Sequence, residues 1–218
     1  MKITIDKSKG PVVFLGSMNA MPMMYALELK KQGVDVLYFV DIPESDTLSR
    51  PENHFKSITY PYPDWIIEFL LKSQILIAFF PKYYSKKIKS LVLKKIGVEA
   101  QCYVTNGYFT SLVPFLKCQN TTTVALSHGS DFHTWADCES AQELAIDFSR
   151  KSIFKYMPKI LAGKIIEAVV KKQYLGFSKS NKVVYFPRGF HKRGDVIIER
   201  LKQANVNIAA RYDVSENP

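Results

Sequence analysis

The alternation of apolar and polar stretches is clearest near the start of the chain. An apolar run at Val12–Leu15 is followed by a short polar loop and then by apolar residues at helical spacing over Met23–Gln32. Gly33 is a typical residue at which a helix ends, and the next apolar run, Val34–Val40, closes on the polar residue Asp41. This order predicts a strand, a helix and a second strand, joined as a right-handed βαβ unit.

The same alternation continues along the rest of the chain. The pattern predicts a proline-containing loop over 42–64, a helix over 65–72, a strand over 75–80, a basic helix over 82–96 closed by Gly97, a strand over 100–105, a short helix over 109–117, a strand over 122–127, a mostly helical stretch over 138–176 broken at Pro158 and Gly163, a strand over 182–186 and a helix over 191–205. Strands that alternate with helices are typical of a parallel sheet. We therefore expect an α/β fold, a Rossmann-like parallel sheet flanked by helices, over residues 1–207, with a polar tail or linker over 208–218.

The composition is that of an ordinary folded protein. Hydrophobic residues make up 47% of the 218 positions and charged residues 23%. The three cysteines, without Cys-x-x-Cys spacing, predict neither disulfides nor a zinc site, and we expect reduced, buried thiols. The first residues lack the apolar core of a signal peptide, and no apolar run is long enough to cross a bilayer. These features predict a cytoplasmic protein whose membrane contact, if it occurs, is peripheral.

The net charge of +10 favours an acidic partner, either a phosphate, a nucleic acid or an anionic membrane. Two stretches, 82–95 and 151–172, interleave lysines with apolar residues at helical spacing. Such helices either lie against anionic lipid or pack on the sheet with their lysines in water. Because no motif for RNA or DNA is visible, we do not expect a nucleic-acid partner.

Candidate site residues follow the predicted strands, since ligands of open parallel sheets bind beyond the strand carboxyl ends. The first such loop holds Gly16, Ser17 and Asn19, which bring backbone and hydrogen-bonding side chains to a helix entrance. It has no G-x-G-x-x-G fingerprint, and the same residues equally suit a tight turn with a helix cap. Asn106 and Gly107 follow a later strand and suit either a ligand contact or a left-handed turn.

The strongest candidate is the cluster His128, Gly129, Ser130 and Asp131 after the strand at 122–127. An imidazole can donate a hydrogen bond to a sugar or phosphate oxygen, and a carboxylate can orient hydroxyls or stabilise positive charge. The alternative is that Ser130 or Asp131 only caps the next helix. The spacing of His128 and His133 does not predict a metal site, and no G-x-S-x-G elbow surrounds Ser130. Arg188, after the last strand, suits an anion contact or a solvated turn.

The βαβ unit at 12–41 and the segment Thr123–Asp131 together resemble the amino-terminal half of bacterial glycosyltransferases with the two-domain GT-B architecture, in the style of retaining family four. The resemblance implies that this half binds the acceptor, while a second domain binds a nucleotide-activated sugar. It also implies attack of an acceptor hydroxyl on the anomeric carbon with retained configuration, and no bound metal or other cofactor. By position, His128 and Asp131 would face the transferred sugar and serve catalysis, with Gly16, Ser17 and Asn19 flanking the acceptor and the donor phosphates.

The resemblance further implies partners and a place in the cell. The acceptor would be a polysaccharide or a lipid-linked sugar of the cell envelope, and the nucleotide sugar would arrive on a second domain or subunit. Such an enzyme would work in the cytoplasm or at the inner face of the plasma membrane. Glu44 and Glu52 match the eight-residue spacing of the family's paired donor-domain glutamates, but their loop context indicates coincidence. A non-catalytic Rossmann-like module that binds a sugar or nucleotide is the alternative.

Overall fold

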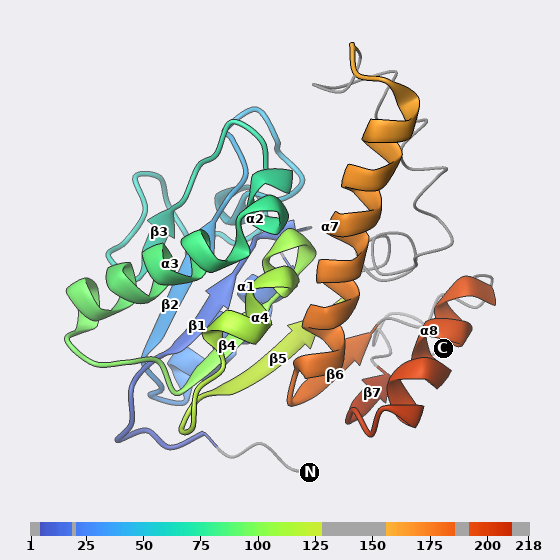
Figure 1. Cartoon of the computed structure of the whole chain (residues 1–218). Coiled ribbons are helices and arrows are strands. Elements are labelled where there is room, and N and C mark those ends of the chain that lie inside the picture. The colour runs from blue at the N-terminus through green and yellow to red at the C-terminus, as the bar shows by residue number, and fades with distance from the viewer. Residues whose placement is uncertain (1–4, 19–20, 128–155, 186–191, 211–218) are drawn as a thin grey trace, which may run out of the picture.

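The computed structural model describes residues 5–18, 21–127, 156–185 and 192–210, and these form a seven-stranded, wholly parallel sheet with helices on both faces (Figure 1). The strand order is β3-β2-β1-β4-β5-β6-β7. The strands are β1 Val12–Leu15, β2 Val36–Val40, β3 Ile66–Glu68, β4 Cys102–Thr105, β5 Thr122–Leu126, β6 Lys182–Tyr185 and β7 Ile208–Ala210. The α/β fold predicted from the sequence is confirmed.

Most of the helices lie on one face of the sheet, which is turned toward the viewer in Figure 1. The helical segments are α1 Met21–Lys31, η2 Pro51–Asn53, α2 Ile75–Phe79, α3 Pro81–Ile96, η3 Gly107–Leu112, α4 Val113–Leu116, α7 Lys159–Lys179 and α8 Lys192–Gln203. Helix α3, η3 and α4 pack on Val13, Leu37 and Tyr103 of this face. Helix α1 covers the opposite face, where it packs on Phe14 and Tyr38.

The central strands are apolar because helices or loops cover both of their faces. Every residue of β1 and of β2 is buried, as continuous apolar runs in a parallel sheet should be. Helix α3 ends as predicted at Gly97, whose φ of 84° is easily reached only without a Cβ atom. Pro81 stands in its first turn, where a missing backbone N–H leaves no hydrogen bond unmade.

Two neighbouring elements are the reverse of the sequence prediction. The segment expected as a helix over 65–72 contains strand β3, and the segment expected as a strand over 75–80 is helix α2. Both are short apolar runs, for which periodicity does not separate helix from strand. The segment that pairs with β2, Tyr38 beside Ile66, becomes the edge strand, while α2 places Ile75 and Ala78 against α7.

Three smaller expectations are also corrected. Residues Ile208–Ala210, assigned from the sequence to the polar tail, form β7 and pair with β6. Helix α7 runs through Gly163 without a break, since one glycine lowers helix stability by only about 1 kcal/mol. Cys118 is exposed, whereas Cys102 is buried as expected.

Helix α7 approaches η3 so closely that only glycine fits between them. A Cβ atom on Gly176 would lie 1.9 Å from the carbonyl oxygen of Thr110. On the same helix, Phe177 packs on Ala125 and Val183 of the sheet. This approach holds η3, and with it the turn at the end of β4, against the body of the domain.

We expect Gly176→Ala to lower the free energy of unfolding by about 1–3 kcal/mol, because the added methyl group must displace backbone rather than a flexible side chain. Urea denaturation followed by circular dichroism measures the change. Ser178→Ala, two residues along the same helix on a half-buried side chain, is the matched control and should stay within about 0.5 kcal/mol of wild type. Equal stability of the two variants would contradict the close approach.

Candidate functional site

The direction of the strand order changes beside β1, which lies between β2 and β4. From β1 the chain leads through α1 to β2 on one side, while the strands that follow β3 are added on the other side. Loops at such a switch point diverge to opposite faces of the sheet and leave a crevice beyond the strand carboxyl ends. The turns after β1 and β4 are therefore the first place to look for a ligand site.

Those two turns are in direct contact. The side-chain amide of Asn106 donates to the carbonyl oxygen of Gly16 at 2.8 Å, and the Asn106 backbone N–H donates to Leu15 at 3.1 Å. Gly16 has φ of 95°, and a Cβ atom there would lie 2.5 Å from Asn106 Oδ1. Any side chain at position 16 would therefore both strain the backbone and push Asn106 away.

A buried carboxylate fixes the next residue of the first turn. Asp41, directly after β2, accepts hydrogen bonds on Oδ1 from the Ser17 backbone N–H at 3.0 Å and from Ser17 Oγ at 3.2 Å. Its Oδ2 accepts from Gln74 Nε2 at 2.9 Å. Burial raises the pKa of Asp41 above its ordinary value, although the Ser17 hydrogen bonds act in the opposite direction. The Ser17 side chain thus points toward Asp41 at the end of β2.

The turn after β4 is held by a hydrogen bond from helix α7. Gln173, fully buried on α7, donates from Nε2 to the carbonyl oxygen of Gly107 at 3.0 Å. Gly107 has φ of 52°, and a Cβ atom there would lie 3.2 Å from Met18 of the first turn. The residues around this edge therefore form one packed unit, built from β1, β2, β4 and α7.

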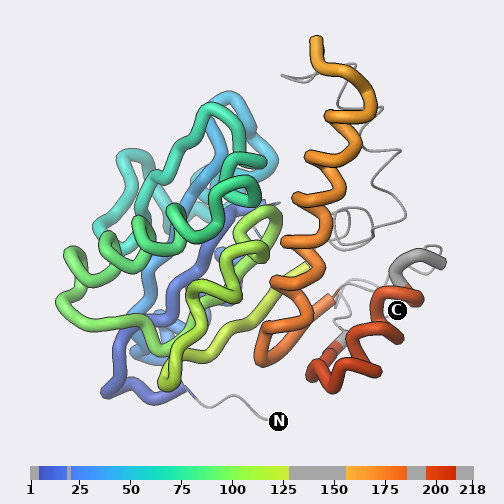
Figure 2. Tube along the Cα trace, viewed as in Figure 1, coloured from blue at the N-terminus to red at the C-terminus, as the bar shows by residue number. Residues whose placement is uncertain are grey.

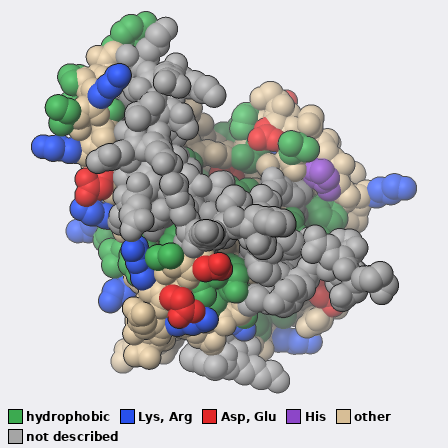
Figure 3. Space-filling view, turned by 90° about the vertical axis from the view of Figure 1, so that its right-hand side faces the viewer, with side chains coloured by type: hydrophobic (Ala, Val, Ile, Leu, Met, Phe, Trp, Pro, Cys, Tyr) green, Lys and Arg blue, Asp and Glu red, His purple; other side chains and the backbone are tan. Residues whose placement is uncertain are grey.

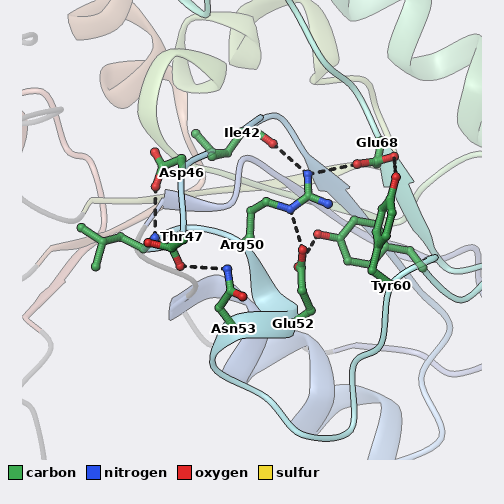
Figure 4. A network of polar contacts seen from close by, with 10 residues as sticks. Ile42, Asp46, Thr47, Arg50, Glu52, Asn53, Tyr60 and Glu68 are labelled. Atoms are coloured by element: carbon green, nitrogen blue, oxygen red, sulfur yellow. Dashed lines mark hydrogen bonds and ion pairs between the residues drawn. The ribbon is translucent and has the colours of Figure 1, made fainter. Parts of the chain in front are cut away.

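The long loop between β2 and β3 is organised by a buried arginine (Figure 4). Arg50 is 1% exposed and pairs with Glu52 at 2.6 Å and with Glu68 at 3.1 Å. Its guanidinium also donates to the carbonyl oxygen of Ile42 at 3.3 Å. It lies 5.2 Å from the ring centre of Tyr60 and 5.1 Å from that of Tyr62. This proline-containing loop is thus tied to the carboxyl ends of β2 and β3.

Of the residues predicted from the sequence, Gly16, Ser17, Asn106 and Gly107 come together at this edge. The side chains of Ser17 and Asn106 are buried and bond to protein groups, so their geometry is that of residues which shape the turns. Asn19, the cluster His128, Gly129, Ser130 and Asp131, and Arg188 lie outside the described residues. Strand β5 ends at the same edge of the sheet, next to β4.

The sequence did not predict the buried polar residues whose hydrogen bonds fix the turns and the β2–β3 loop. Asp41 carried a signal, since a carboxylate directly after an entirely apolar strand has to find partners at the sheet edge. Gln74 and Gln173 carried none, because their partners are 33 and 66 residues away, and for Arg50 only the pairing with Glu52 is local, while Glu68 is 18 residues away. Within the described ranges, no three His, Cys, Asp or Glu side chains gather as metal ligands would.

No protein-family model matches the sequence, and no curated protein sequence matches it. The fold, however, is similar to solved UGT structures. A UDP-glucose: anthocyanidin 3-O-glucosyltransferase in complex with UDP has a TM-score of 0.53 at 11% identity, over 94% of this chain and 53% of that one. A UGT of Phytolacca americana gives 0.52 at 8% identity, over 94% and 52%. A Medicago truncatula UGT complexed with UDP-glucose gives 0.51 at 9% identity, over 97% and 54%.

The chain therefore spans about half the length of these solved structures. The likeness extends over almost the whole of the present chain, so it concerns the sheet and its helices together. A seven-stranded parallel sheet flanked by helices is the Rossmann-like fold of one GT-B half. At these identities the likeness shows the fold, and the function is argued below from the site.

We expect Asp41→Ala to lower the free energy of unfolding by about 1–3 kcal/mol, because it leaves the Ser17 N–H buried without an acceptor. Asp41→Asn keeps an oxygen for Ser17, and Gln74 can turn its amide to accept from the new Nδ2, so this variant should stay close to wild type at pH 3.8 and below, where Asp41 is neutral. Chemical denaturation measures both.

The pH dependence of stability, compared between wild type and Asp41→Asn, tests the raised pKa of Asp41. Because the pKa of Asp41 is raised on folding, its contribution favours the folded state most below its unfolded value of 3.8 and declines as pH rises through the folded value. Asp41→Asn should therefore gain stability relative to wild type as the pH rises above 3.8. If the difference in unfolding free energy between Asp41→Asn and wild type stayed constant above pH 3.8, the raised pKa of Asp41 would be contradicted.

We expect Arg50→Gln to lower the free energy of unfolding by about 3–5 kcal/mol at neutral pH, because two carboxylates lose their common partner. The pKa of Glu52 is lowered by its hydrogen bonds with Tyr62 and Arg50, which outweigh the opposing effect of burial. Stability from a lowered pKa is lost as the pH falls, so the difference between wild type and variant should shrink below 4.5. Denaturation midpoints of wild type and Arg50→Gln, taken above and below pH 4.5, measure this difference. An equal loss of stability at both pH values would contradict the lowered pKa of Glu52.

Proposed function

We propose that this chain is the acceptor-binding half of a bacterial glycosyltransferase with GT-B architecture, of the retaining family-four type. The observation that carries the proposal is the contact between the turns after β1 and β4 at the switch point of a parallel sheet. The GT-B fold of the solved neighbours supports it. The resemblance of residues 12–41 and 123–131 to that family supports the choice of half.

In the proposed reaction, an acceptor hydroxyl attacks the anomeric carbon of a nucleotide-activated sugar. A new bond joins the acceptor oxygen to that carbon, the bond from that carbon to the diphosphate oxygen of the nucleotide breaks, and the hydroxyl proton passes to an oxygen of the departing diphosphate. Configuration at the carbon is retained. His128 donates a hydrogen bond to the transferred sugar, and Asp131 orients its hydroxyls and stabilises the positive charge that develops at the anomeric centre.

The described residues would bind and orient substrates in this scheme. Gly16 would lie beside the acceptor and the donor phosphates, and its missing side chain makes room for Asn106, which joins the two turns. Ser17 is held by Asp41, and Gly107 by Gln173, so both turns keep their shape without help from a ligand. Such preorganisation lowers the entropy that substrate binding must lose. Asn19, Gly129, Ser130 and Arg188 complete the proposed substrate contacts.

The donor would come from a second domain or a second subunit. The three solved structures named above are about twice the length of this chain, and two of these three are complexed with UDP or UDP-glucose. For this protein we propose a nucleotide sugar as the donor and a polysaccharide or lipid-linked sugar as the acceptor. The chain by itself should bind acceptor but turn over slowly or not at all. We place the reaction on the cytoplasmic side of the plasma membrane.

We expect His128→Ala and Asp131→Ala each to lower kcat/KM of the enzyme completed by its donor half by at least about a hundredfold, because each removes an interaction with the reacting sugar. Circular dichroism should show an unchanged fold. Leu48→Ala, on an exposed side chain of the β2–β3 loop, is the control and should leave the rate unaltered.

Experiments on the isolated chain distinguish the proposed half of an enzyme from a non-catalytic binding module. Titration calorimetry with lipid-linked acceptors and with a panel of nucleotide sugars should show binding of acceptor alone. Robust sugar transfer by the purified chain, without a second polypeptide, would overturn the assignment as a half enzyme. Unchanged rates of both variants in the completed enzyme would remove His128 and Asp131 from the site, whereas no sugar transfer with any donor half would favour the binding module.

A further inference from the structure

The positive charge of the protein is concentrated on two helices. Helices α3 and α7 contain eleven lysines and a single acidic residue, Glu167, so together they carry the +10 net charge of the whole chain. The other 19 Lys and Arg residues are balanced by 19 Asp and Glu residues. A charge that only kept the protein soluble would not need to gather in this way.

The two helices belong to one layer. Helix α3 packs on the sheet through Tyr84, Ile88 and Val92, and α7 packs on the same face through Phe177. Figure 2 shows both helices on the side turned to the viewer, with η3 and α4 between them. Within the described part of the chain, ion pairs occupy only Lys95, with Asp64, and Lys171, with Glu167, among these lysines. The outer side of the layer is thus strongly cationic.

Exposed apolar side chains gather on the same layer. Among the described residues, ten of the sixteen exposed large apolar side chains lie on or next to α3, α4 and α7. They are Phe80, Tyr83, Leu93, Ile96, Val98, Phe115, Tyr156, Ile160, Leu161 and Leu175. At the start of α7, Ile160 is 79% exposed and Tyr156 91%. Figure 3 shows hydrophobic and basic side chains alternating down its left-hand edge, where α7 lies.

We infer that this layer, which we call the α3–α7 face, binds the surface of an anionic lipid bilayer. Lysines beside exposed aliphatic and aromatic side chains match both parts of such a surface, since the lysines meet the headgroups and the apolar groups enter the boundary below them. A nucleic acid would be attracted by the charge but would leave the exposed isoleucine and leucine of α7 without a partner. In the described residues no helix is long and apolar enough to cross a membrane.

The test is sedimentation of the full chain with phosphatidylcholine vesicles that contain or lack phosphatidylglycerol. We expect binding to the anionic vesicles only, falling by at least about tenfold between about 0.05 and 0.5 M salt, because salt screens the lysine–headgroup attraction. Replacing Lys82, Lys86, Lys159 and Lys164 together by Gln should weaken binding by at least about tenfold. Ile160→Ser with Leu161→Ser should weaken it by at least about fivefold and leave its salt dependence in place.

Two matched controls separate position from composition. Replacing Lys7, Lys30, Lys31 and Lys56 by Gln removes the same charge from exposed positions away from the α3–α7 face, and binding should not change. Met24→Ser with Leu48→Ser removes two exposed apolar groups outside that face, again without effect. Circular dichroism confirms that each variant is folded.

Three results would overturn the inference. They are equal binding to neutral and anionic vesicles, equal losses from both lysine sets, or RNA in slight excess displacing the protein from anionic vesicles. The last result would assign the face to nucleic acid. None of these outcomes depends on glycosyltransferase activity, so the lipid contact and the proposed reaction stand or fall separately.

Discussion

The contact between Gly16 and Asn106 is the constraint on which the carboxyl edge of the sheet depends. The 2.8 Å hydrogen bond joins the turns after β1 and β4, and it leaves no room for a side chain at position 16. Each turn has a second hydrogen bond to a buried side chain. Asp41 accepts from Ser17 in the turn after β1, and Gln173 donates to Gly107 in the turn after β4. The backbone of both turns is therefore set by contacts within the protein.

The side chains that hold the two turns are polar and buried, and burying a polar group lowers stability unless hydrogen bonds replace its hydration. Asp41 is charged in water and buried here, and its raised pKa shows that the hydrogen bonds from Ser17 do not fully replace the lost hydration. Gln173 uses its amide N–H on Gly107, while its Oε1 has no partner within the described ranges. Residues that served only packing would be apolar at these places. Their polarity is explained by the need to hold two backbone turns at a fixed separation.

The sequence predicted what depends on neighbours along the chain and failed where distant partners decide. The βαβ unit at 12–41, helix α3 with its end at Gly97 and strands β4 and β5 follow from periodicity and turn residues. Strand β3 and helix α2 were exchanged, because two short apolar runs differ only in whether they reach β2 or α7. Gly16 and Asn106 were predicted as site residues, but their mutual hydrogen bond spans 90 residues and no local pattern encodes it.

Helix α7 connects the two surfaces to which we assign functions. Its inner side carries Gln173 and Gly176, which hold the turn after β4, while its outer side carries Lys164 and exposed apolar residues. A helix is stiff over the 21 residues of α7, so the α3–α7 face and the turn after β4 keep a fixed relation. A protein bound to a bilayer through the α3–α7 face would therefore hold the turns after β1 and β4 at a constant distance from that bilayer. In the function that we propose, this arrangement would suit an acceptor whose lipid anchor stays in the membrane while its sugar reaches the carboxyl edge of the sheet.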